Sequence, residues 1–189
     1  GRHIIKKEFA DALKLVDNPL PREHLAQHPH DYIGALKKLP FRLLRLYVNA
    51  YQSWLWNETV AEFLRQKFSQ CREVSYSQGS VVFVDGTLPD MDVPLLGFSG
   101  WEKGDNPELR KIINALTKRH TLQPADFIIR AIPELSMEGG LRALAVQVQK
   151  LVVGQREPDE LNLGKSKIIL TFILPKGSYA TMTVRKMFP

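Results

Sequence analysis

The sequence predicts a mixed α/β chain, of the α+β kind, on three observations. The longest run without Gly or Pro, Arg42 to Arg65, has the apolar periodicity of a helix. From Val74 onward, short apolar runs alternate with turn residues, which is typical of strands. The end of the chain, 166–188, carries an apolar strand-like run followed by a short helical pattern. Helices therefore come first, a mixed region follows, and one strand and one helix close the chain.

The composition is that of a globular protein. At 189 residues, with 44% hydrophobic and 24% charged residues, the chain is long enough for one ordinary domain or two small ones. Its formal net charge is +6, and the stretch from Lys165 to Pro189 contains five basic residues and no acidic one. Such an excess suits a polyanionic partner, although many basic proteins bind no polyanion.

Cys71 is the single cysteine of the chain, which excludes an intramolecular disulfide and a zinc site built on paired cysteines. A reducing, cytoplasmic (intracellular) location is therefore expected. No apolar run approaches the roughly 20 residues that span a membrane, and the N-terminus lacks the apolar core of a signal peptide. The chain begins with Gly1 and not Met, which suggests a piece of something longer.

The first 39 residues predict helices. Residues 2–16 form one amphipathic pattern, and a weaker one over 23–39 is interrupted at Pro29 and restarts at Asp31. Three histidines lie near the interruption: His24, His28 and His30. Pro29 breaks their helical spacing and no H-E-x-x-H motif is present, so we expect a solvated turn there and no metal site.

The helix over 42–65 is the element around which we expect the chain to be organised. At 3.6 residues per turn its polar residues gather in one sector of roughly 100°. This stripe consists of Arg42, Arg45, Asn49, Gln52, Ser53 and Trp56. Apolar residues fill most of the remaining circumference, so the helix should be buried in a core. The stripe then meets water along the arginine stems, another polar surface, or a ligand.

The middle of the chain predicts alternating short elements. A hairpin is expected from Val74 to Val84, an irregular connection over 87–104, and a helix that Asn106-Pro107 begins and that runs to His120. This helix is followed by a short helical turn at 124–127 and a strand over 127–132. After a turn at Gly139-Gly140, we expect a half-exposed strand over 143–153 and a polar loop over 155–164. The last elements are a buried strand over 166–174 and a helix over 178–188 with Ser178 as its cap.

No motif pairs a nucleophile with a base, and there is no P-loop, G-x-S-x-G or G-x-G-x-x-G. We therefore assign no catalytic residue and no cofactor. The polar stripe and a second cluster, Lys176, Ser178, Tyr179, Thr181 and Arg185, favour a polyanionic partner over catalysis, because a helix start with cations and hydroxyls binds phosphates and aromatics beside cations stack on bases. The alternative is structural: Tyr179 in the core and Lys176 in a turn.

Two stretches resemble a known family. RLLRLYVNAYQSWLWNETVAE, 42–62, resembles the helix of TruD-type tRNA pseudouridine synthases with its A-x-x-S-x-L-F-N core, Trp56 replacing the usual Phe. FILPKGSYATMTVRKMF, 172–188, resembles the family's C-terminal F-x-L-P-x-G-S-Y-A-T-x-x-x-R-E signature, with Lys186 where the family has Glu. VPLLGF (93–98) and PADFIIRAIPELSMEGGLRAL (124–144) are similar to its insertion domain.

The resemblance implies an organisation and a chemistry. Residues 1–71 and 165–189 would belong to the α/β catalytic domain of a pseudouridine synthase, and residues 72–160 would form the TruD-specific insertion domain. The family isomerises uridine to pseudouridine in structured RNA such as tRNA, without cofactor or metal, using an aspartate. The resemblance makes Arg42, Arg45, Asn49, Gln52, Lys176, Tyr179 and Arg185 candidate RNA-binding residues, and Ser53, Asn57 and Ser178 candidate active-site supports.

The family's G-x-K-D-x-x-A-x-T motif with the catalytic aspartate is absent from these residues, as is its N-Y-F-G-x-Q-R-F-G segment. We expect both upstream, and expect this chain alone to be inactive as an isomerase. Two alternatives stay open: a non-catalytic basic RNA-binding module, and a protein-interaction domain without nucleic acid. No motif specifies the RNA, the uridine or the oligomeric state.

Overall fold

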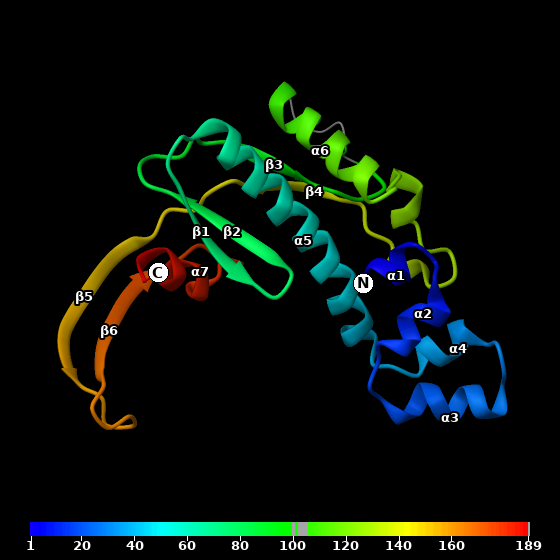
Figure 1. Cartoon of the computed structure of the whole chain (residues 1–189). Helices are drawn as coiled ribbons and strands as arrows, with labels where there is room; N and C mark the ends of the chain where they lie inside the picture. The colour runs from blue at the N-terminus through cyan, green and yellow to red at the C-terminus, as the bar shows by residue number, and fades with distance from the viewer. Residues whose placement is uncertain (100, 102–105, 189) are drawn as a thin grey trace.

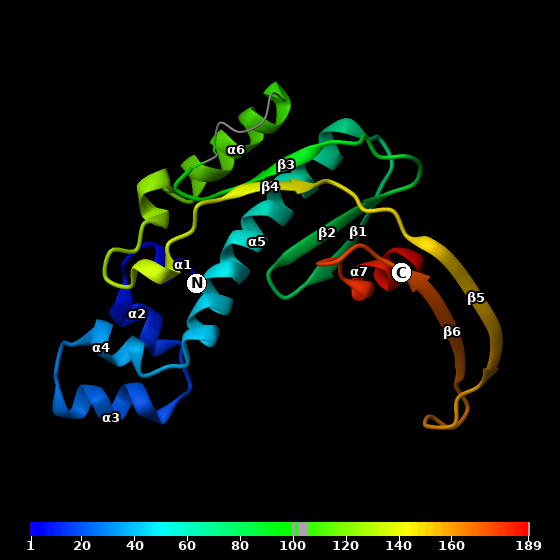
Figure 2. The ribbon, with the colours of Figure 1, turned by 180° about the vertical axis from the view of Figure 1, so that it is seen from behind.

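The computed structural model describes residues 1–99, 101 and 106–188 (Figures 1 and 2). Helices and antiparallel strand pairs occupy separate parts of the chain, which confirms the α+β fold class. The helices are α1 (Arg2–Ile5), α2 (Phe9–Lys14), α3 (Pro19–Gln27), α4 (Tyr32–Lys37), α5 (Phe41–Lys67), α6 (Pro107–Arg119) and α7 (Ala180–Met187). The strands are β1 (Cys71–Tyr76), β2 (Gly79–Val84), β3 (Asp92–Leu95), β4 (Gly140–Ala143), β5 (Gln149–Pro158) and β6 (Ser166–Ile173). Two 3₁₀ turns, η1 (Pro124–Phe127) and η2 (Pro133–Leu135), precede β4.

The helix α5 is the central element of the fold, as the sequence predicts. It begins directly after Pro40 and runs diagonally through the molecule, in contact with α1, α6, β2 and β3 (Figure 1). Its N-terminal half and middle contribute Leu44, Val48 and Leu55 to one apolar core, which also contains residues of α1, α4 and η1. Its C-terminal half contributes Phe63 and Leu64 to a second core beneath β2, β3 and α6. One continuous helix therefore joins both cores.

The predicted helix over residues 2–16 is wrong as one element, because α1 and α2 are separated at Lys6–Glu8. Lys7 adopts a left-handed backbone conformation with φ of 60°, which a continuous helix does not allow. The break turns both lysines toward η1. Lys6 Nζ donates to the carbonyl of Thr121 at 2.6 Å and to the carboxylate of Asp126 at 3.2 Å, and Lys7 Nζ donates to the carbonyl of Ala125 at 3.1 Å. Tertiary contacts thus override the local helical pattern.

Local end signals place the next helices correctly. Asp31 caps α4 through a hydrogen bond from the Gly34 amide to its Oδ1 at 2.9 Å, as the predicted restart requires. Asn106 Oδ1 accepts from the amides of Glu108 at 2.9 Å and Leu109 at 3.1 Å, with Pro107 at the first position of α6. A cap beside proline defines a helix start from local chemistry alone.

The predicted hairpin over 74–84 is confirmed and starts earlier, at Cys71, with Cys71 opposite Val84 and Tyr76 opposite Gly79. The segment 87–104 was predicted to be irregular, but Asp92–Leu95 forms β3, which pairs with β4. Residues 100 and 102–104 of that segment lie outside the described residues. The predicted strand over 127–132 is also wrong. Phe127, Ile129 and Ile132 enter the core while Ile128 is exposed, and the amide of Ile129 is satisfied by Ser136 Oγ at 2.9 Å.

In the β1–β2 hairpin, the carboxylate of Glu73 accepts three hydrogen bonds. Arg65 donates to its two carboxylate oxygens at 2.8 and 2.9 Å, and the Ser80 hydroxyl donates at 2.7 Å. The hydrogen bonds from Arg65 and Ser80 lower the pKa of Glu73 from 4.5 to about 2. This cluster fastens the C-terminal part of α5 to the β1–β2 hairpin.

Ser80→Ala should raise the pKa of Glu73 toward its ordinary value, because one of the donors to the ionised carboxylate is removed. Since folding lowers this pKa, the stabilisation by the ionised carboxylate is present above pH 4.5 and is lost as the pH falls toward about 2. The Glu73 side chain is solvent-exposed, so the change in stability should stay within about 1 kcal/mol. An NMR titration of the carboxyl carbon checks the pKa, and an unchanged value in the variant would contradict the assignment.

The last strands form a separate hairpin, β5–β6, which curves around α7 at the end of the molecule away from α1–α4 (Figures 1 and 2). The predicted polar loop over 155–164 is wrong in its first part, since β5 runs to Pro158. The predicted burial of the last strand is also wrong for this chain, because most of β6 is exposed. The hairpin joins residues on both sides of the boundary predicted between 160 and 165, so the division 1–71, 72–160 and 165–189 stays a prediction.

Candidate nucleic-acid interface

The polar stripe of α5 divides into an open half and a covered half. Arg42, Arg45 and Asn49 are exposed on its N-terminal part. Further along, Gln52 is 5% exposed, and its Nε2 donates to the Leu96 carbonyl at 2.6 Å. Trp56 is half-buried, and its Nε1 donates to the Val93 carbonyl at 3.3 Å. The covered half therefore holds β3 and the residues after it, and the open half carries the exposed arginines.

A hollow of about 220 Å³ lies where the two halves of the stripe meet. Its α5 wall is formed by Arg45, Val48, Asn49 and Gln52, and its other wall by Leu95 and the segment 134–139. Arg45 and Asn49 supply donors on one side, while Glu134 and Glu138 supply acceptors on the other. A hollow lined by both donors and acceptors suits a polar ligand with both kinds of group better than a bare phosphate.

Gly97 and Gly139 set the shape of this hollow. The chain segments after β3 and before β4 lie side by side, with hydrogen bonds from the Phe98 amide to the Met137 carbonyl at 2.8 Å and from the Ser99 amide to the Glu138 carbonyl at 2.9 Å. A Cβ on Gly97 would lie 2.2 Å from the nitrogen of Gly139, and Gly139 has φ of 89°. Two glycines thus allow the two backbones to approach more closely than residues with a Cβ would permit.

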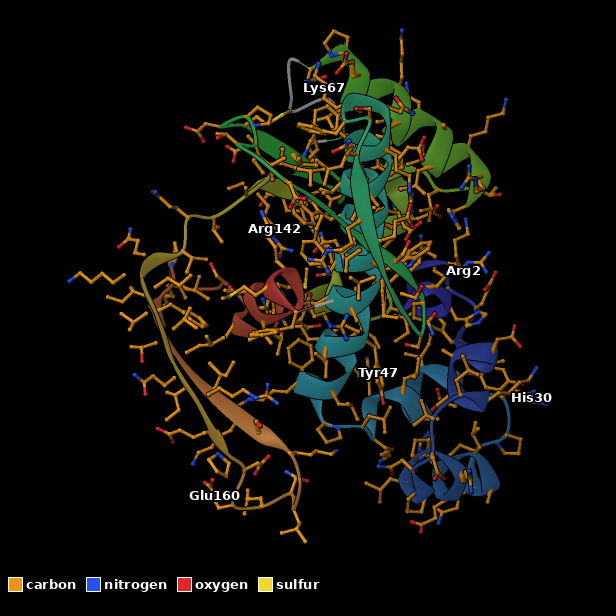
Figure 3. All side chains as sticks on the ribbon, turned by 60° about the vertical axis from the view of Figure 1, so that its left-hand side comes forward. Arg2, His30, Tyr47, Lys67, Arg142 and Glu160 are labelled. Carbon is orange, nitrogen blue, oxygen red and sulfur yellow. The ribbon has the colours of Figure 1, made fainter. Side chains whose placement is uncertain are left out.

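Arg142 is a candidate that the sequence patterns do not single out. It lies opposite Val93 in the β3–β4 pair, and its guanidinium carbon lies 5.2 Å from the centre of the Trp56 ring. In the view of Figure 3 its side chain extends on the side where α7 lies. A guanidinium stacked on an indole and still exposed can contact a phosphate or a base edge. It therefore continues the cationic surface beyond the covered part of the stripe.

The second predicted cluster surrounds the start of α7. Lys176, Tyr179 and Arg185 are exposed, and Tyr179 is 70% exposed, so the alternative that this tyrosine lies in the core is not supported. Ser178 is half-buried and does not cap the helix, since α7 starts at Ala180 with Tyr179 at the cap position and no side-chain cap bond. The prediction of Ser178 as the cap is therefore wrong.

The helix α7 is anchored by Arg72 of β1. The guanidinium of Arg72 donates to the carbonyl of Arg185 at 3.3 Å and to that of Lys186. Both carbonyls belong to the last turn of α7, where a cation is favoured by the helix dipole. In the described part of the chain, no hydrogen bond or salt bridge joins the α7 cluster to the polar stripe of α5. The two predicted sets of RNA-binding residues thus lie on separate helices, α5 and α7, which are linked through the β1–β2 hairpin.

The two predicted supports on α5 are half-buried, and Asn57 lies beside a tyrosine of the hairpin. Burial raises the pKa of the Tyr76 phenol, whose hydroxyl is buried, and the neighbouring Asn57 amide opposes that shift. The Tyr76 hydroxyl makes no hydrogen bond within the described residues, so Asn57 is a neighbour of the hairpin and not a demonstrated anchor for it. Ser53 stands one turn before Asn57 on the same face, and its role as an active-site support stays a prediction.

The described residues contain no group of three or more His, Cys, Asp or Glu side chains placed to hold a metal ion. The histidine cluster is arranged differently, with His24 Nε2 hydrogen-bonded to Asp31 Oδ2 at 2.8 Å. Within the same part of the chain, no helix is both long and apolar enough to cross a membrane.

The α+β chain thus presents exposed arginines and an exposed asparagine beside a small polar hollow. The profile of the family described as tRNA pseudouridine synthase D (TruD) matches residues 2–93 and 91–187. The chain belongs to this family, and the resemblance found in the sequence is confirmed.

Its relatives include curated proteins and one solved structure. It is 36% identical to "Probable tRNA pseudouridine synthase D" of Methanopyrus kandleri, over 95% of this chain and 42% of the relative. It is 32% identical to the protein of the same name from Methanosarcina acetivorans, over 98% of this chain and 48% of the relative. The crystal structure of the putative TruD of Methanosarcina mazei matches with a TM-score of 0.63 and 26% identity, over 88% of this chain and 43% of the other. The chain spans less than half the length of these relatives.

Proposed function

We propose that this chain is the RNA-binding and scaffold portion of a tRNA pseudouridine synthase, an isomerase that converts uridine to pseudouridine in RNA. The observation that carries the proposal is the open half of the α5 stripe, where Arg42, Arg45 and Asn49 are exposed beside the polar hollow. Membership of the TruD family supplies the class of reaction and makes tRNA the expected RNA. An intracellular location agrees with such a substrate.

The proposed roles follow from where the side chains lie. Arg42 and Arg45 bind backbone phosphates and set the register of the RNA, since cations contact phosphates without reading sequence. A uridine must leave its stack before its glycosidic bond can be reached, and an exposed aromatic such as Tyr179 stabilises an unstacked base. Gln52 lines the hollow, but its side-chain amide nitrogen donates to the Leu96 carbonyl, so we assign it to the scaffold. The catalytic aspartate is contributed from outside these residues, and no cofactor or metal is part of the proposal.

Arg42→Ala and Arg45→Ala should each weaken tRNA binding by about threefold to tenfold at low salt, because each variant loses one charge-assisted phosphate contact. The plot of log affinity against log salt concentration should flatten by about one unit or less per removed contact. A gel shift of the 189-residue chain with tRNA over a salt series measures both quantities.

Arg22→Ala is the control, because Arg22 is also exposed but lies on α3, outside the polar stripe of α5. Its affinity and salt slope should match those of the unchanged chain. Salt-independent binding, or equal losses in all three variants, would contradict the proposed interface. Isomerisation of tRNA by the 189-residue chain alone would contradict the assignment of the aspartate to another segment.

A further inference from the structure

The helix α7, beside which the α7 cluster of Lys176, Tyr179 and Arg185 lies, is weakly packed. None of its side chains is buried, and it contributes no residue to either apolar core. An eight-residue helix is unstable by itself in water, so α7 depends on its attachment to other elements. Whatever fixes α7 on the molecule therefore also decides where the α7 cluster lies.

Arg72 of β1 supplies the polar attachment of α7. Its guanidinium donates to the carbonyl of Arg185 at 3.3 Å and to the carbonyl of Lys186. In the part of the chain that the structure describes, no other hydrogen bond and no salt bridge joins α7 to another helix or strand. The carbonyls of the last helical turn have no partner inside the helix, and the fork of an arginine can satisfy two of them at once.

The Arg72 side chain is in turn held by the hairpin. Arg72 stands opposite Phe83 in the β1–β2 register, and directly opposed residues of an antiparallel pair lie on the same face. Its guanidinium carbon lies 5.2 Å from the centre of the Phe83 ring, which is a cation–π contact. Figures 1 and 2 show α7 beside this hairpin, on the side of β5–β6.

The next residue of β1, Glu73, attaches the opposite face of the hairpin to α5. Side chains alternate between the two faces of a strand, and Glu73 accepts two hydrogen bonds from Arg65 of α5. Val82, which stands opposite Glu73, is buried in the second core. Consecutive residues of one strand thus bind α7 on one face and α5 on the other. The hairpin therefore sets the separation of the two helices.

Given the RNA binding proposed above, we propose that Arg72 is a positioning residue, which holds α7 so that the α7 cluster and the α5 stripe contact the same RNA molecule. While α7 is held, its contacts to RNA form without the free-energy cost of ordering the helix. Two binding elements at a fixed separation also raise the effective concentration of each at the RNA. Arg72 acts through α7, because its guanidinium is directed at the α7 carbonyls.

Arg72→Lys tests this role, because it keeps the charge but replaces the planar fork with a single ammonium group. The amides of α7 should exchange with solvent faster in this variant, while the urea midpoint stays unchanged, since α7 buries no residue. Affinity for tRNA at low salt should fall by about threefold to tenfold. Arg22→Lys makes the same change on α3 and should leave the exchange, the midpoint and the affinity unchanged.

A comparison in two backgrounds separates positioning from direct contact with RNA. When Lys176, Tyr179 and Arg185 are all replaced by alanine, Arg72 has no cluster to position, and Arg72→Lys should cause no further loss of affinity. In the Arg42→Ala background the full threefold to tenfold loss (about the same as in the unchanged chain) should remain, because Arg42 lies on α5.

Unchanged exchange of the α7 amides in Arg72→Lys would overturn the proposal, as would a further loss of affinity in the background without the α7 cluster. The exchange measurement needs no RNA, so it reports on the attachment of α7 by itself. If tRNA does not bind the 189-residue chain, or if Arg42→Ala and Arg45→Ala leave its affinity unchanged, the proposed function fails first, and the role of Arg72 in RNA binding fails with it.

Discussion

Leu55→Ala is expected to lower the free energy of unfolding by about 2–5 kcal/mol. Leu55 is fully buried in the middle of α5, in the core that also contains residues of α1, α4 and η1. Truncation removes its apolar contacts and leaves a cavity among elements that come from distant parts of the chain and cannot all move in to fill it. Because α5 joins both cores, the loss should appear in the unfolding of the whole molecule. Urea denaturation monitored by tryptophan fluorescence measures it.

Leu46→Ala is the matched control on the same helix. Leu46 is 59% exposed, so the same truncation should change the stability of the 189-residue chain by no more than about 0.5 kcal/mol. Equal losses at Leu46 and Leu55 would contradict the described burial of α5.

The sequence predicted correctly those elements whose signals are local. The start of α6 depends on Asn106 and Pro107, and the course of α5 depends on a long run free of Gly and Pro; both signals act within one or two turns. The hairpin β1–β2 likewise follows from its own turn. The resemblance to the TruD family was equally accessible, since it rests on contiguous motifs.

Features that depend on distant partners were missed. The apolar run at 127–132 looks like a strand, yet the core takes its side chains from irregular backbone that Ser136 helps to satisfy. Periodicity places Gln52 in the stripe but cannot show that the Leu96 carbonyl lies over it. Arg142 becomes a candidate only through the β3–β4 register, which brings it over Trp56. Burial of β6 was predicted from composition, whereas burial depends on neighbours.

The second large loss of stability is expected for Gly139→Ala, where two chain segments approach closely beside the hollow. A Cβ on Gly139 would lie 2.6 Å from the carbonyl oxygens of Leu95 and Ser99, and its φ of 89° is unfavourable for any other residue. Left-handed strain costs about 1–2 kcal/mol, and a clash with backbone atoms adds about 1–3 kcal/mol, because backbone yields less readily than a flexible side chain. We therefore expect a loss of about 2–5 kcal/mol in urea denaturation.

Gly86→Ala separates the two contributions. Gly86 also has a positive φ, 107°, but no atom lies within 4 Å of an added Cβ, so this variant should lose only the strain of about 1–2 kcal/mol. Gly139→Ala should also weaken tRNA binding at a temperature where both variants are folded, because the segment that moves forms the wall facing Arg45 and Asn49. Gly86→Ala should leave that affinity unchanged. Equal stabilities for the two variants would show that the backbones at Gly97 and Gly139 do not approach as closely as described. The described wall of the hollow would then be wrong.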